Sequence, residues 1–180
     1  MIVFDPARSI EKSVKTLKRR VRVLKKSAAE QVVQSAQLAG AREIAKAGKS
    51  LLPSGYKYLK KGIRARVVRR KSKGQRIVKV GFGVGLSREK QDAIKRKRER
   101  KRGSGSGISI RNIHWKVTGL KTRNRRHKSG KPTGTHGPDP KFQNFMYRAA
   151  QSGRSSATRA IRRVGKAKLA IQVAKIRKKR

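Results

Sequence analysis

Cysteine is absent from this chain of 180 residues, so disulfide bridges, cysteine-based zinc ribbons, iron–sulfur clusters and thiol catalysis are excluded. Apolar runs are short, and none approaches the roughly 18 residues that a membrane helix requires. Residues 1–6 lack the long apolar stretch of a secretory signal peptide, so we expect none. Aromatic residues make up only 4 % of the chain, which predicts a small, mostly aliphatic core.

Acidic residues are also scarce: eight Asp and Glu stand against 53 Lys and Arg, which leaves a net charge of +45. Such a charge opposes compaction by self-repulsion. Each cation that meets a phosphate also releases a condensed counterion, which favours binding to nucleic acid. We therefore expect part of this charge to face nucleic acid or acidic protein rather than to serve solubility alone.

Groups for catalysis or metal binding are few. The eight acids form no paired motif, and we expect Asp139 to cap a helix rather than to act as an acid or base. His114, His127 and His136 lack the fixed spacing of a metal site. The GFGVG segment at 81–85 lacks the Lys-Ser/Thr of a phosphate-binding loop, so we expect its glycines to ease the end of a strand. The sequence thus predicts no enzyme, no metal and no cofactor.

The N-terminal quarter has helical periodicity. Apolar and small residues recur every three or four positions between Val14 and Ala39, which predicts one long helix over 6–49. Asp5 is its expected cap, and Gly40 and Gly48 are the candidates for a kink and an end.

The middle of the chain alternates like β-strands. Runs 62–70 and 76–84 flank a turn at 72–75, which predicts an antiparallel hairpin with one apolar and one basic face. A third strand is expected over 108–118, with a bulge near Asn112.

Basic segments surround these elements. Residues 87–102 read as an exposed helix or a disordered arm, and 103–107 (GSGSG) as a flexible tether. A long loop over 119–140 precedes a helix expected from Lys141 to about Val164. The sequence therefore predicts an α+β domain over 1–165, with an arm and tether (87–107) inserted in its sheet. A basic C-terminal tail over 166–180 follows.

Three segments resemble the small tail-completion, or neck, proteins of long-tailed bacteriophages. They are 49–55 (KSLLPSG), 113–119 (IHWKVTG) and 138–142 (PDPKF), the last followed by Phe145 and Ala149-Ala150. In that family a long first helix ends in a Pro–Ser/Thr–Gly turn, a sheet strand leads into a Gly-Thr turn, and a Pro-Phe entry starts a closing helix. The matching positions here are Pro53, Gly55, Trp115, Gly119, Pro140 and Phe142. The acid that often precedes the family's Gly-Thr turn is missing, and the segment beyond Arg163 has no counterpart.

The resemblance implies a non-enzymatic virion protein, assembled in the host cytoplasm as a homo-oligomeric, typically hexameric ring. Such a ring links the connector or stopper to the tail tube and surrounds the DNA path. The segment 159–180 and two groups of basic residues would contact phosphate or acidic partners. These residues are Arg88, Lys95, Arg96, Lys97, Arg98, Arg100, Lys101 and Arg102 in the arm, and Lys121, Arg123, Arg125, Arg126 and Lys128 in the loop.

Two other functions fit the composition. A ribosomal RNA-binding protein would use basic arms on a small domain to contact phosphates and 2′-hydroxyls. A nucleoid-type protein would compact any duplex in a salt-sensitive manner.

Overall fold

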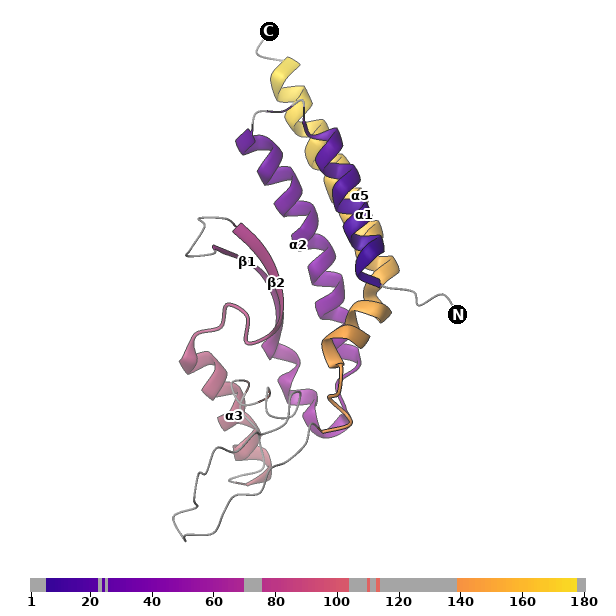
Figure 1. Cartoon of the computed structure of the whole chain (residues 1–180). Helices are drawn as coiled ribbons and strands as arrows, with labels where there is room; N and C mark the ends of the chain where they lie inside the picture. Colours follow the sequence, from indigo (N-terminus) through magenta and orange to yellow (C-terminus); the bar gives the residue numbers. More distant parts are fainter. Residues whose placement is uncertain are drawn as a thin grey trace, which may run out of the picture.

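The computed structural model describes residues 6–22, 24, 26–69, 76–103, 110, 113 and 139–177, and its fold class is α+β, as predicted. The elements in chain order are α1 (Pro6–Arg20), α2 (Lys26–Ser50), the 3-10 helix η1 (Ser54–Gly62), β1 (Ile63–Arg69), β2 (Arg76–Phe82), α3 (Arg88–Arg102) and α5 (Phe145–Arg177). Helices α1, α2 and α5 lie side by side, the hairpin lies against α2, and α3 projects beyond the end of the hairpin (Figure 1).

The predicted single helix over 6–49 is wrong, because the chain turns back between α1 and α2. At the turn, the Val21 amide donates to the Leu17 carbonyl and the Leu24 amide donates to the Val21 carbonyl, at 3.1 and 3.0 Å. The reversal lays α1 mainly against α5 and buries Leu17, Val21 and Leu24 with Ile161. A straight helix would leave this apolar stripe in water, so tertiary packing favours the break.

Gly40 and Gly48 both lie inside α2, which continues past them to Ser50 and packs against α5. A Cβ at Gly40 would lie 2.7 Å from Cγ1 of Ile161, which is 1 % exposed. A Cβ at Gly48 would lie 3.4 Å from the Ala149 Cβ, an ordinary contact. The glycines therefore allow close approach of two long helices, and the tighter approach is at Gly40.

The C-terminal helix begins later and ends later than predicted. Asp139 Oδ1 accepts a hydrogen bond from the Lys141 amide at 3.0 Å, but in a turn that precedes the helix. Asn144 then has φ 51°, and α5 starts at Phe145. Asp139 therefore caps that turn and not α5. The helix continues to Arg177, because Leu169 and Val173 near its C-terminal end pack against the cluster that contains Leu17 of α1 and Val21.

The hairpin is confirmed: β1 and β2 pair antiparallel, with Ile63 opposite Phe82 and Arg66 opposite Lys79. Ile63, Ala65, Val80 and Phe82 pack against the core, whereas Arg64, Arg66 and Lys79 are exposed. The alternation places one face of the sheet on α2 and a basic face in water, as the sequence predicts.

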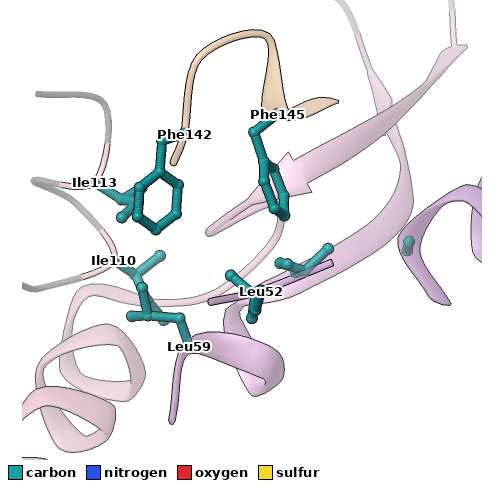
Figure 2. Close-up of a cluster of buried hydrophobic side chains, with 8 residues drawn as sticks. Leu52, Leu59, Ile110, Ile113, Phe142 and Phe145 are labelled. Carbon is teal, nitrogen blue, oxygen red and sulfur yellow. The ribbon is translucent and has the colours of Figure 1, made fainter. Parts of the chain in front are cut away.

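The predicted third strand falls almost entirely outside the described residues. Ile110 lies in a turn and Ile113 is helical, so neither is part of the sheet, which has two strands among the residues that are described. Both side chains are 3 % exposed and pack against the ring of Phe142 and its neighbours (Figure 2). The apolar residues of this segment thus join the core without a strand at these two positions.

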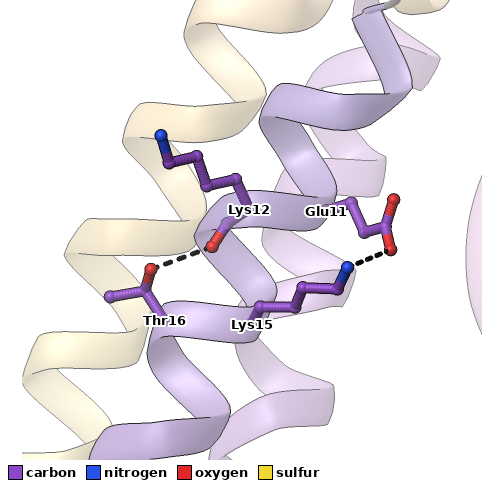
Figure 3. Close-up of polar contacts among 4 residues, drawn as sticks. All are labelled: Glu11, Lys12, Lys15 and Thr16. Atoms are coloured by element: carbon purple, nitrogen blue, oxygen red, sulfur yellow. Dashed lines mark hydrogen bonds and ion pairs between the residues drawn. The ribbon is translucent and has the colours of Figure 1, made fainter.

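Helix α1 carries an exposed, basic outer face. Lys15 Nζ lies 3.0 Å from Glu11 Oε1, and the Thr16 hydroxyl donates to the Lys12 carbonyl at 2.9 Å (Figure 3). The two charged side chains are 71 % and 60 % exposed, so the ion pair contributes little to stability. This face is solvated, and helix α1 itself lies on the far side of the bundle from α3 (Figure 1).

Candidate polyanion interface

Helix α3 is formed by signals within its own sequence. The Ser87 hydroxyl accepts a hydrogen bond from the Lys90 amide at 3.4 Å, and Glu89 lies in the first turn, near the positive end of the helix dipole. The last turn holds Arg100, Lys101 and Arg102, near the negative end. Gly103 ends the helix with φ 89°. Of the two states that the sequence left open for 87–102, the helix is the one observed.

The side of α3 that faces the protein is lightly packed. Ile94 touches the core cluster, and the Gln91 side chain donates to the Leu86 carbonyl at 3.0 Å. Lys95 Nζ lies 3.2 Å from Glu99 Oε1, and both side chains are partly covered. The helix has no fully buried residue, so its position depends on a few contacts along one side.

A row of aromatic rings connects α3 to the core. The guanidinium carbon of Arg98 lies 5.3 Å from the centroid of the Tyr58 ring, a cation–π contact. Tyr58 stacks with Tyr56 at 6.5 Å, and Tyr56 meets Phe142 edge-on at 4.8 Å. Phe142 in turn lies 5.8 Å from Phe145 (Figure 2). The inward-facing Arg98 is thus bound to the end of a continuous aromatic row that starts in the core.

The outer side of α3 is almost purely cationic. Seven basic side chains are exposed: Arg88, Lys90, Arg96, Lys97, Arg100, Lys101 and Arg102. Of the three acids of the helix, Asp92 and Glu99 are partly covered and only Glu89 is exposed. The helical repeat thus turns two of three carboxylates toward the protein. The exposed face keeps an excess of positive charge over a length of about 22 Å.

The predicted contact residues divide into three groups. Arg88, Arg96, Lys97, Arg100, Lys101 and Arg102 are exposed on the outer side of α3. Arg98 and Lys95 instead contact Tyr58 and Glu99. The loop residues Lys121, Arg123, Arg125, Arg126 and Lys128 lie outside the described residues, as do His114, His127 and His136.

Of the positions that carry the family resemblance, the structure describes some and leaves others outside the described residues. Pro53 immediately precedes η1, Gly55 lies in its first turn, and Phe142 is fully buried beside the start of α5. Pro140 lies in the turn before α5. Trp115 and Gly119 lie outside the described residues.

The glycines at 81–85 end the strand, as predicted, and connect it to α3. Strand β2 ends at Phe82, and Gly83 and Gly85 adopt φ values of 70° and 67°, which L-residues rarely adopt. The Gly83 amide donates to the Gly62 carbonyl at 2.8 Å, and the Arg66 guanidinium donates to the Gly85 carbonyl at 3.2 Å. This turn therefore sets the position at which α3 begins.

Sequence reasoning missed the partners of Arg98. Tyr56 and Tyr58 flank a lysine in a segment too short to predict a helix or a strand, so their sequence gave no reason to place them beside the basic arm. The weak signal was that two of the chain's eight aromatic residues lie two positions apart, in a segment that the strand and helix patterns left unassigned.

Other site types find no support in the part of the chain that the structure describes. No three His, Asp or Glu side chains lie together there as metal ligands would. Among the same residues, no helix combines the length and apolar character needed to cross a bilayer.

Comparison with known proteins adds no relative. No family model, no curated protein and no solved structure matches the chain.

Proposed function

We propose that this protein is a structural, non-enzymatic component of the head–tail junction of a long-tailed phage. It would assemble as a homo-oligomeric ring between the connector or stopper and the tail tube, with DNA passing through. The ring would form in the host cytoplasm and remain in the virion.

The observation that supports this function best is the meeting of two segments that suggested the resemblance. Leu52, from the junction after the first helices, shares a core with Phe142 and Phe145, from the entry to the closing helix (Figure 2). These segments are separated by about ninety residues. The resemblance implies a long first helix, a small sheet and a closing helix; the chain has a small sheet and a long last helix, although its first helix is divided into α1 and α2.

The charge distribution also favours this function. The basic arm forms a separate helix with no buried residue at the edge of the shared core, as an insertion into a neck-type domain would. A ring of chains that each carry +45 is repulsive unless anions lie close by. DNA in the lumen and acidic neighbouring proteins would supply them.

Electron microscopy and native mass spectrometry of the purified full chain test the proposal. We expect closed rings with a central opening, and we expect the protein in purified phage particles at a fixed copy number. A monomer at all concentrations that is absent from particles would overturn the proposal. Retention on ribosomal subunits through high-salt washing would replace it with the ribosomal alternative.

A further inference from the structure

We infer that the outer side of α3 binds the phosphodiester backbone of double-stranded DNA, without reading its sequence, and that the Arg98–Tyr58 contact orients this side of the helix. This inference rests on the proposed function, in which DNA passes the protein, and it specifies which face meets the polyanion. Two features of the structure support it: the sorting of charges around α3 and the composition of its outer face.

The distribution of charges around α3 shows which side of the helix is available to a ligand. Glu99 is turned inward and paired with Lys95, and Arg98 contacts the Tyr58 ring. One side of the helix therefore makes its contacts within the protein. Arg96 and Arg100 are four residues apart, as are Lys97 and Lys101, and all four side chains are exposed to solvent. Residues at this spacing lie about 5–6 Å apart, so the four form two adjacent rows along one face.

The composition of that face favours nucleic acid over acidic protein. Protein interfaces are anchored by buried aromatic and apolar side chains and are depleted in lysine. Here the exposed face contains only Ala93 as an apolar residue and no aromatic ring. Interfaces with nucleic acid are polar and strongly positive. Duplex DNA presents about one negative charge per 1.7 Å of axis, so a helix of about 22 Å faces many phosphates at once.

The absence of aromatic rings on this face also determines the mode of binding. Single-stranded nucleic acid is held by stacking of bases on aromatic side chains. The Tyr58 ring, which contacts α3, is engaged by Arg98 on the inner side. Contacts from the outer side therefore go to phosphates, which position a protein but carry no sequence information.

The test uses the full-length chain and two variants, each lacking four exposed cations. The first carries Arg96→Gln, Lys97→Gln, Arg100→Gln and Lys101→Gln on α3. The matched control carries Lys12→Gln, Lys18→Gln, Arg19→Gln and Arg20→Gln on the exposed face of α1. Fluorescence anisotropy measures binding to two 30-base-pair DNA duplexes of unrelated sequence, to an RNA duplex of equal length, and to polyglutamate, between 50 and 300 mM salt.

We expect the α3 variant to lose affinity for both DNA duplexes equally, by at least about tenfold at 100 mM salt, and the slope of log K against log salt to fall by about three to four. The α1 control should change the slope by less than about one. Thermal unfolding of both variants should match the parent, because every altered side chain is exposed.

The inference would be overturned by equal loss of DNA affinity in both variants, by loss confined to polyglutamate, or by loss confined to the RNA duplex. Equal loss in both variants would mean that binding depends only on net charge. Loss confined to polyglutamate would mean that the partner is an acidic protein, and loss confined to the RNA duplex would mean that the ligand is RNA. A sequence preference between the DNA duplexes would contradict the backbone mode. Ring formation is measured on the same samples, so rings with unaltered DNA binding refute this inference alone. A parent chain that stays monomeric at all concentrations and is absent from phage particles refutes the proposed function.

Discussion

Helices α3 and α5 each carry nine basic residues, yet they are stabilised in opposite ways. Helix α3 has a capping serine, an acid in its first turn, cations in its last turn and a terminal glycine, but no buried residue. Helix α5 has no acid at all, and it is preceded by Asn144 in a left-handed conformation. It nevertheless forms 33 residues of helix against α1 and α2.

The difference shows two uses of positive charge in one chain. Helix α5 places its cations around a stripe of small and apolar residues, so tertiary packing outweighs the repulsion between them. Helix α3 has no such stripe, and local signals must hold it together. We therefore expect mutations of packing residues to act globally through α5 and mutations of local signals to act only on α3.

The largest expected effect is at the start of α5. Phe145 is fully buried and lies 5.3 Å, centroid to centroid, from the Phe82 ring. Phe145→Ala should lower the free energy of unfolding by about 3–5 kcal/mol. Ile94→Ala, which removes the apolar anchor of α3, should cost about 1 kcal/mol because that side chain is only partly buried.

Urea denaturation followed by circular dichroism measures both changes. If Phe145→Ala proves too unstable to purify, Phe145→Leu gives a smaller shift of the same sign. Equal costs at Phe145 and Ile94 would contradict the idea that α5 belongs to the core and α3 does not.

The next effect separates two glycines on the α2–α5 interface. Gly→Ala within a helix favours folding by about 1 kcal/mol through propensity alone. At Gly40 the new methyl group would collide with buried Ile161 and approach the Ala157 carbonyl to 3.3 Å, which should cost about 1–3 kcal/mol. At Gly48 the nearest atom is at 3.4 Å, so the propensity gain should remain.

Thermal unfolding of the two variants should therefore give shifts of opposite sign, with Gly40→Ala lower and Gly48→Ala higher than the parent. Stabilisation by both substitutions would mean that α2 and α5 are less closely packed than the structure has them.

The sequence predicted the elements whose signals are local. The hairpin followed from alternation on both sides of a turn, and α3 coincides with the basic segment after Ser87. It did not predict the break between α1 and α2, because the apolar stripe continues through it and only packing against Ile161 makes the reversal favourable.

The candidate interface was predicted in position but not in orientation. The run of cations located it, but only the helical repeat and the contact with Tyr58 show that Arg98 faces inward while Arg96 and Lys97 face outward. The tertiary structure brings the aromatic ring of Tyr58, from η1, to α3. No pattern within residues 87–102 predicts this contact.

The smallest expected effect tests whether α3 is stabilised by local signals such as its capping serine. Ser87→Ala removes the hydroxyl that caps α3, which should cost about 1 kcal/mol of helix stability. Because α3 has no buried residue, this cost should appear as faster amide hydrogen exchange across its first turns, by about fivefold, with global unfolding unchanged. Ser155→Ala, at an exposed position inside α5, is the matched control and should leave exchange in α3 untouched. A fall in global stability after Ser87→Ala, similar to that after a core substitution, would mean that α3 folds as part of the bundle. The charged helix would then depend on the same packing as α5, and its basic outer face would be less free to meet a polyanion without disturbing the rest of the fold.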